Sequence, residues 1–363
     1  PSVKFEKAKL VSVESVDGFF SFSIPTLIAT TKGVFMTKTK YLTERPKDNA
    51  NGLFGFPINL DIDNIEADIA ILGVPYGLPY RPNYFANDQS KTPDLLRKNV
   101  SFMEKAWEDS RIQKHFDWDL GGPLLNNQDI QVIDCGNVWN SFRDPRENYY
   151  LRAEKAAAKI FASKATLITI GGDHGITIPI LKALPKDIPI TLIQIDSQMD
   201  WTDDLDGIKD GYASPIKRAS ELGSITSIFQ LGLRGVGNGR EEEYEAAVAY
   251  GSTMISAYEI HQIGITSILE KIPSGGFFYL SIDANGLDPS IMPAVNAPAP
   301  GGFSWIQIKD FIHGLVRKGR VLGMDLVEIS PSLGNKKTTF VHAERLICNF
   351  IGASVRAGYY DQN

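Results

Sequence analysis

Residues 165–175, ATLITIGGDHG, combine the two features on which the fold and the chemistry of this chain depend. The first half is a short apolar run with β-branched side chains, which predicts a strand buried on both faces. Two glycines, Gly171 and Gly172, then let the backbone turn sharply and leave His174 beyond the strand. The stretch therefore predicts a polar side chain presented at the carboxyl end of a buried strand.

Similar apolar runs alternate with amphipathic stretches along the rest of the chain. They are ADIAILGVP (67–75), IQVIDCG (130–136), ITLIQID (190–196), SIFQLGL (227–233), STMISAY (252–258), FFYLSID (277–283) and VLGMDLV (321–327). The predicted helices lie near 92–108, 147–163, 239–250, 304–318 and 338–354. Alternation of this kind predicts an α/β fold with three layers, αβα, in a single domain whose mostly parallel sheet has about eight strands.

The first 66 residues lack this alternation. They carry scattered aromatic residues and a polar, turn-rich break, TERPKDNANG, at 43–52. We interpret residues 1–66 as an N-terminal arm that packs on its own domain or on a neighbouring subunit, and 67–363 as the α/β domain.

Composition narrows the classes of partner. The 363 residues carry a formal net charge of −6, which disfavours nucleic acid and anionic membranes as partners. The N-terminus PSVKFEKAKL has no apolar signal core and no run of about 18 apolar residues occurs, so we expect a soluble, cytoplasmic protein. Cys135 and Cys348 lie in apolar stretches, which favours reduced core residues over a disulfide or a metal site.

Three predicted strand ends carry polar clusters: GGDHG at 171–175, DSQMD at 196–200 and SIDANGLDP at 281–289. If the chain stays extended, residues 196, 198 and 200 share one face, as do 283 and 285. A lone His or Asp at a strand end is equally well explained as a helix cap. Three carboxylates brought together must either shift their pKa values upward or bind a cation, and a divalent metal is the simpler outcome.

These motifs resemble the ureohydrolase superfamily, which includes arginase, agmatinase and related guanidine hydrolases. The family pattern GGDHS, DAHxD, SxDxDxxDP and VE followed by Pro reads here as GGDHG, DSQMD, SIDANGLDP and DLVEISP. The resemblance covers residue 67 to the end and implies the arginase-like fold. It also implies hydrolysis of a guanidine at two divalent ions, usually manganese and sometimes nickel, with release of urea and an amine.

The resemblance implies a complete set of ligands for the first of these ions only. That set is His174, Asp196, Asp200 and Asp283. The second ion requires a His at 198 and an Asp at 285, where this chain has Gln198 and Asn285. Neutral carboxamides are weaker ligands than imidazole or carboxylate. We therefore expect one divalent ion, Mn or Ni, and no second ion.

Other positions of the family pattern are partly kept. Tyr212 replaces a His that the family uses for substrate positioning or proton transfer, and a phenol with a pKa of roughly 10 is a poor proton shuttle. Glu328 matches the carboxylate that pairs with the substrate guanidinium, although a surface Glu at a strand end is the plainer alternative. The loop GVPYGLPYRPNYF departs from the family's GVPFDxGTxxRPG, with Asn83 in the last Gly position. The remaining histidines, His115, His261, His313 and His342, fall in predicted helices or their ends.

Three functions stay open. In the first, the chain is a non-catalytic or weakly active subunit beside an active ureohydrolase paralogue in a trimer- or hexamer-type hetero-oligomer. Biguanide (metformin) hydrolases, which pair an intact subunit with a metal-poor one, resemble this case. Alternatively, it hydrolyses a small guanidine or amidine alone with one metal, using Glu328 and Tyr212. The third possibility is a module that binds a ligand without chemistry.

Overall fold

The computed structural model describes residues 42–47, 52–78, 88–107, 111–140, 144–237 and 239–361. All of them belong to the unit Lys40–Asn363. Most of the predicted arm, residues 1–41, 48–51 and the loop position Asn83 lie outside the described residues. The described part of residues 1–66 contributes Thr43–Glu44 to the sheet and buries Leu53 and Phe54 in the core.

A nine-stranded sheet runs through the domain in the order β1-β3-β2-β4-β9-β8-β5-β6-β7. The strands are β1 (Thr43–Glu44), β2 (Ile69–Val74), β3 (Val132–Val138), β4 (Thr166–Gly171), β5 (Ile190–Ile195), β6 (Ile225–Leu233), β7 (Thr253–Ser256), β8 (Phe277–Asp283) and β9 (Arg320–Val327). All neighbouring pairs are parallel except β1 with β3. The expected α/β fold is thus confirmed, and each of the eight predicted runs forms a strand. The short antiparallel β1 was not predicted, because two residues give no periodicity.

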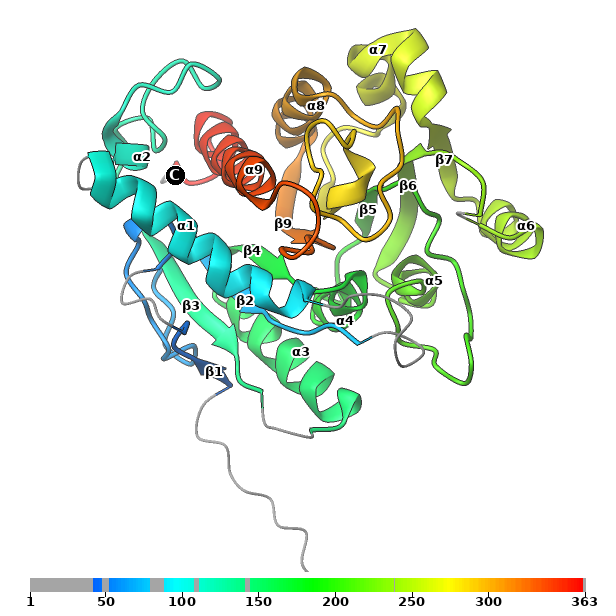
Figure 1. Ribbon diagram of the computed structural model, residues 1–363, viewed down its shortest axis with the longest axis horizontal. Coiled ribbons are helices and arrows are strands. Elements are labelled where there is room, and N and C mark those ends of the chain that lie inside the picture. Colours follow the sequence, from blue (N-terminus) through cyan, green and yellow to red (C-terminus); the bar gives the residue numbers. More distant parts are fainter. Residues whose placement is uncertain are drawn as a thin grey trace, which may run out of the picture. The chain divides into compact units, whose positions relative to one another are not determined.

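The α-helices cover both faces of the sheet (Figure 1). They are α1 (Thr92–Trp107), α2 (Arg111–Lys114), α3 (Arg146–Ala162), α4 (Thr177–Lys182), α5 (Pro215–Ala219), α6 (Glu241–Tyr250), α7 (Ala257–Lys271), α8 (Trp305–Lys318) and α9 (Lys336–Arg356). The five predicted helices match α1, α3, α6, α8 and α9. The run 252–258 is strand only to Ser256, where the Ser256 side chain accepts a hydrogen bond from Glu259 N and caps α7.

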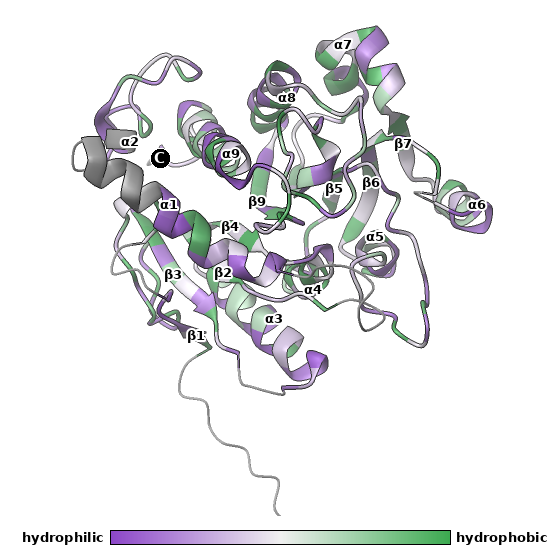
Figure 2. Cartoon of the chain, in the orientation of Figure 1, coloured by the Kyte–Doolittle hydropathy of each residue, from purple (hydrophilic) through white to green (hydrophobic). Residues whose placement is uncertain are grey.

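Alternation along the strands divides the core into two clusters. Ile69 and Ile71 of β2 belong to the cluster that also holds residues of α1, α7, α8 and α9, whereas Ala70 and Leu72 belong to the cluster that holds residues of α3, α4 and α5. Strands buried on both faces read as continuous apolar runs, which explains why the sequence pattern is so clear. In contrast to the strands, α8 and α9 are amphipathic, and Figure 2 shows hydrophilic and hydrophobic residues on different sides of each of these helices.

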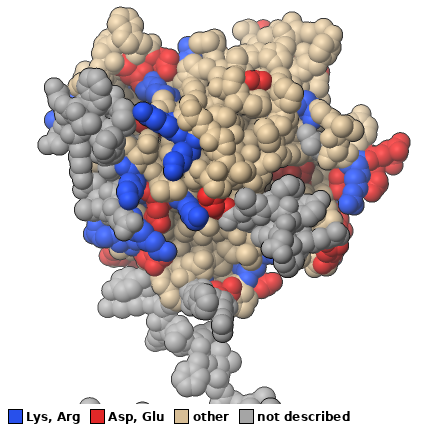
Figure 3. All heavy atoms as spheres, in the orientation of Figure 1, with Lys and Arg blue, Asp and Glu red and all other residues tan. Residues whose placement is uncertain are grey.

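The surface view in Figure 3 shows Lys and Arg interspersed with Asp and Glu on the face that is drawn. None of the helices in the described part of the chain is both long and apolar enough to span a lipid bilayer.

Candidate functional site

His174 is positioned by a tight crossing of two loops at the carboxyl end of β4. Gly172 is required there, because a Cβ atom on it would lie 1.5 Å from Tyr76 O. Asp173 then begins the 3-10 helix His174–Ile176, its side chain accepting hydrogen bonds from Gly175 N (3.1 Å) and Leu78 N (3.0 Å). The sequence prediction that two glycines turn the chain and present His174 therefore agrees with the structure.

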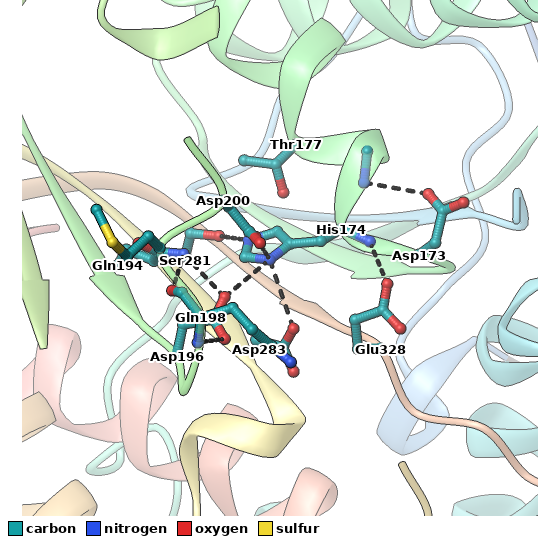
Figure 4. A network of polar contacts seen from close by, with 12 residues as sticks. Asp173, His174, Thr177, Gln194, Asp196, Gln198, Asp200, Ser281, Asp283 and Glu328 are labelled. Atoms are coloured by element: carbon teal, nitrogen blue, oxygen red, sulfur yellow. Dashed lines mark hydrogen bonds and ion pairs between the residues drawn. The ribbon is translucent and has the colours of Figure 1, made fainter. Parts of the chain in front are cut away.

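Three carboxylates surround the His174 ring (Figure 4). The Nδ1 atom lies 2.7 Å from Asp200 Oδ2, 3.1 Å from Asp196 Oδ2 and 3.5 Å from Asp283 Oδ2. Ligand atoms of His174, Asp196 and Asp200 all lie within 4.8 Å of one another. The four residues that the resemblance assigns to the first ion are thus brought together from three strand ends.

The route by which they converge differs from the extended geometry expected from the sequence. The Asp196 side chain accepts from Gln198 N (2.9 Å), and the Asp283 side chain accepts from Asn285 N (2.7 Å). Such bonds to the backbone two residues on form turns that end the strands. Asp200 has a left-handed backbone with φ 49°. The expectation that residues 196, 198 and 200 share one extended face, and likewise 283 and 285, is wrong.

Burial makes this cluster electrostatically costly without a cation. Burial and the neighbouring Asp196 raise the pKa of Asp200 to about 7 and raise the pKa of Asp283 well above its usual value. Burial by itself would lower the pKa of His174, but Asp200, Asp196 and Asp283 together raise it far above its ordinary value. Metal-free, the cluster therefore holds protons that a divalent ion would displace.

The donor set fits one divalent ion. His174 Nδ1 and Asp200 Oδ2 are buried, and within the described residues neither has a hydrogen-bond partner of good geometry. One imidazole nitrogen with carboxylate oxygens suits Mn, Ni or Zn rather than a soft metal. The remaining ring nitrogen, His174 Nε2, lies 3.0 Å from Ser281 Oγ, which donates to Asp325 Oδ1 (2.6 Å). Contacts of this kind fix the orientation of a ligating imidazole.

The positions that the resemblance assigns to a second ion are occupied differently. Asn285 Nδ2 donates to Gln198 Oε1 at 2.8 Å, so the two carboxamides bond to each other. Asn285 Oδ1 accepts from Ser197 N (3.1 Å) and Ser197 Oγ (2.7 Å). The oxygens that either amide would offer a metal are therefore already engaged in hydrogen bonds.

A cavity of about 170 Å³ opens beside this cluster. Its lining consists of Gln89, Gln198, Asp200, Tyr212, Ala213, Asp283, Asn285, Asn296, Ala297 and Glu328. The cavity thus unites the predicted Tyr212 and Glu328 with both sets of metal positions. Glu328 follows β9 with a left-handed backbone (φ 64°), and only 8% of the residue is exposed, so the surface alternative for Glu328 is wrong.

Glu328 is held from two sides. Its Oε1 accepts from His174 N at 2.7 Å, and its Oε2 accepts from Gln89 Nε2 at 3.0 Å. Burial raises the pKa of Glu328, and burial together with Glu328 raises the pKa of Asp173 to about 8. A carboxylate fixed in this way at a cavity wall is suited to bind a group with several N–H donors.

Sequence reasoning missed Gln89, Asn296 and the residues that support the cluster. Gln194 Nε2 donates to Asp196 Oδ2 at 2.8 Å from within β5, and Asp325 supports Ser281 from within β9. A single polar residue inside an apolar parallel strand was the available signal for Gln194 and Asp325. No such signal marks Gln89, at the start of a 3-10 turn, or Asn296, in a loop rich in Ala and Pro.

The other histidines do not join the cluster in the described structure. His115 follows α2 at the surface, and His261 of α7 lies 3.0 Å from Gly301 O. His313 of α8 contacts Asn349, and His342 of α9 packs against Trp305.

Comparison with known proteins finds ureohydrolases among the relatives of this chain. A relative in Thermus thermophilus, an N(1)-aminopropylagmatine ureohydrolase, is 33% identical over 51% of this chain and 62% of its own, which is less than two thirds of its length. An agmatinase of Neisseria meningitidis is 28% identical over 80% of this chain and 88% of its own.

Solved structures share the fold at lower identity. The proclavaminate amidino hydrolase of Streptomyces clavuligerus superposes with a TM-score of 0.69 at 21% identity, covering 85% of this chain and 98% of that one. The arginase of Bacillus subtilis superposes with a TM-score of 0.62 at 20% identity, covering 78% and 98%. The model of the arginase family matches residues 67–352, most of the chain, and this protein therefore belongs to the arginase family.

Proposed function

We propose that this chain is a ureohydrolase-family subunit with a one-ion site, non-catalytic or weakly active alone, that works beside an active paralogue in a hetero-oligomeric guanidine or biguanide hydrolase. The single observation that carries the proposal is the hydrogen bond between Asn285 Nδ2 and Gln198 Oε1. This bond joins two neutral carboxamides at the positions where the family pattern has the ligands of a second ion.

The first-ion position supports the retention of metal. Three carboxylates within 3.5 Å of one imidazole nitrogen would repel each other strongly without a cation. His174, Asp196, Asp200 and Asp283 would hold the ion, which would supply Lewis acidity beside the cavity. We propose Mn or Ni as the ion.

The protein's own groups divide the remaining tasks. Glu328 would bind and orient a guanidinium, because its carboxylate is fixed by His174 N and Gln89 Nε2 and lines the cavity. Tyr212 lines the same cavity in the position where the family pattern has a His. Replacing imidazole by phenol removes a group that exchanges protons readily at neutral pH. The site thus retains binding while losing a second Lewis acid and a proton carrier.

The relatives and the cavity together support a proposal for the substrate class. The curated relatives are named for agmatine and aminopropylagmatine, both guanidine compounds. We propose a guanidine- or biguanide-type compound such as metformin as the substrate of the assembly, with a urea-type product and an amine released. The trimer- or hexamer-type assembly with an active paralogue stays a proposal, as does a cytoplasmic location.

An autonomous single-metal amidine or guanidine hydrolase is the alternative. The intact Glu328 contact network favours it, since a decayed pocket need not keep a buried carboxylate fixed by two donors. It leaves unexplained why both carboxamides occur at positions of the same ion.

The test is hydrolysis by the purified chain, alone and co-expressed with its genomic neighbour. Release of the urea-type product and of ammonia or amine is measured on guanidine, agmatine and metformin. The proposal predicts negligible turnover alone and activity in the co-expressed complex. Turnover alone comparable to that of an intact ureohydrolase would contradict it. The triple variant Gln198→His, Asn285→Asp and Tyr212→His should raise turnover of the isolated chain, with Asn64→Asp on the surface as a matched control.

A further inference from the structure

Two glutamines lie inside adjacent strands of the sheet, close to the candidate metal site. Gln194 of β5 and Gln230 of β6 are direct neighbours in the parallel pair, and neither is exposed to solvent. The other buried residues of these two strands are apolar or glycine. A buried amide is costly unless it is hydrogen-bonded, and an apolar side chain of similar size would avoid that cost. The presence of two such amides side by side therefore calls for an explanation.

Hydrogen bonds link the two amides into a chain that ends on a candidate metal ligand. Ser252 Oγ donates to Gln230 Oε1 at 3.0 Å, and Gln230 Nε2 donates to Gln194 Oε1 at 2.7 Å. Gln194 Nε2 then donates to Asp196 Oδ2 at 2.8 Å (Figure 4). All three bonds donate toward Asp196, so they polarise one another in the same direction. The chain thereby holds the same oxygen of Asp196 that lies 3.1 Å from His174 Nδ1.

Gln230 also contacts the backbone next to a second candidate ligand. Its Nε2 donates to Met199 O at 2.7 Å. Met199 directly precedes Asp200, whose backbone is left-handed with φ 49° and whose Oδ2 lies 2.7 Å from His174 Nδ1. A left-handed conformation is costly for a residue other than glycine and needs support from its surroundings. The bond from Gln230 to Met199 O provides such support.

The orientation of both amides follows from their partners. A carboxylate and a backbone carbonyl only accept hydrogen bonds, so the NH₂ group of Gln194 faces Asp196 and that of Gln230 faces Met199 O. With Gln194 in this orientation, its Oε1 accepts the second N–H of Gln230. Two separate requirements thus lead to the same arrangement, and both N–H groups of Gln230 are used.

We propose that Gln230 is a positioning residue of the first-ion site, which holds Asp196 through Gln194 and Asp200 through Met199 O and contributes no ligand itself. The inference rests on the proposed function only in that a divalent ion occupies the first-ion position. A merely structural role, in which the amides join β5 to β6, would change the free energy of unfolding but not the coordination of an ion. Backbone pairing already joins these strands.

The test is the affinity of the purified full chain for Co²⁺, measured by competition with a chelator. The absorption spectrum of the bound Co²⁺ reports its coordination geometry, and urea unfolding of the metal-free chain reports stability. Gln230→Met and Gln194→Met keep the length of the side chain and remove both polar atoms. Thr166→Val is the matched control, because Thr166 is also buried in this sheet but its Oγ1 accepts from Tyr360 OH at the start of β4, away from the metal site.

The expected results separate positioning from general stability. Gln230→Met and Gln194→Met should each weaken Co²⁺ binding about 10- to 100-fold and shift the spectrum, because ligands lose the groups that hold them. In the double variant the loss should be smaller than the product of the two single losses, since Gln230 acts on Asp196 through Gln194. Thr166→Val should leave affinity and spectrum unchanged, whatever its effect on unfolding. Wild-type affinity and spectrum in Gln230→Met, or single losses that multiply in the double variant, would overturn the proposal.

Gln230→Glu keeps the test decisive if Gln230→Met fails to fold. A carboxyl group can still accept from Ser252, but it donates at most one hydrogen bond and cannot serve both Gln194 Oε1 and Met199 O. Gln230→Glu should therefore also weaken Co²⁺ binding and shift the spectrum, and wild-type binding in this variant would overturn the proposal. A wild-type chain that binds no divalent ion would contradict both this inference and the proposed function. Turnover by the isolated chain would contradict the proposed function alone, so the two failures are distinguishable.

Discussion

Replacing Asn285 by Asp tests the role of the amide pair through stability. The change removes the hydrogen bond from Asn285 Nδ2 to Gln198 Oε1 and sets an oxygen against an oxygen. The lost bond costs about 1 kcal/mol. The new carboxylate is almost fully buried near Asp283, so it must either stay protonated or repel its neighbour, at about 1.4 kcal/mol for each tenfold change in its acid dissociation constant.

Together these costs predict that Asn285→Asp lowers the free energy of unfolding of the metal-free chain by roughly 3 kcal/mol, at the low end of values for an unpaired buried charge. The assay is urea unfolding at pH 7 in the presence of a chelator. Excess Mn²⁺ stabilises both proteins through the first-ion position, but it should reverse most of the variant's loss, because the new carboxylate lets the variant bind a further ion, which at about 100 times its Kd stabilises by about 2.7 kcal/mol. Both of the other Asn285 acceptor contacts, with Ser197 N and Oγ, remain possible for a carboxylate.

Asn64→Asp is the matched control, since Asn64 is exposed and its Nδ2 donates to Asp61 Oδ2. It should change stability by no more than about 0.5 kcal/mol, with or without metal. An Asn285→Asp variant as stable as the wild type in chelator, or one with the same loss in chelator and in Mn²⁺, would contradict the expected role of the amide pair.

Three further outcomes are expected. The folded-state pKa of Asp200 lies near 7, above its unfolded value of about 4. As the pH rises from about 4 to 7, the folded state gives up its extra proton, so the free energy of unfolding of the metal-free chain should fall while its metal affinity rises. Urea unfolding at a series of pH values checks the sign. Ser281→Ala should lower metal affinity by about 10- to 100-fold by releasing the His174 ring, measured by competition with a chelator, whereas the exposed Ser332→Ala should not. The Cys135 thiol, buried and with a pKa raised by burial to about 12, should react with a thiol reagent only on unfolding, as followed by absorbance.

The sequence was informative about the sheet because parallel strands are buried on both faces. Each of the eight apolar runs became a strand, and His174, Asp196, Asp200 and Asp283, from the three strand-end clusters, lie close together. The local path was harder to predict. The side chains of Asp196 and Asp283 bond to the backbone two residues on, and these turns replace the extended geometry that alternation suggests.

Contacts between segments distant in sequence were beyond prediction. Gln89 reaches Glu328 across 239 positions of the chain, and no periodicity or motif links a polar loop residue to a partner so far away. The hydrogen bond between Asn285 and Gln198 could not be predicted for the same reason, although the sequence showed that each residue departs from the family pattern. Motifs therefore identified the candidate ligands, and only the fold showed how Gln198 and Asn285 are hydrogen-bonded.

A chain with the proposed one-ion site would differ from a two-ion ureohydrolase in the number of metal ions that it binds. The decisive experiment is the metal content of the purified chain by mass spectrometry, after saturation with Mn²⁺ or Ni²⁺ and removal of loosely bound ions. We expect about one ion per chain in the wild type, none in His174→Ala, and a rise toward two in the double variant Gln198→His, Asn285→Asp. Two tightly held ions per wild-type chain would show that the amide pair does not exclude the second ion.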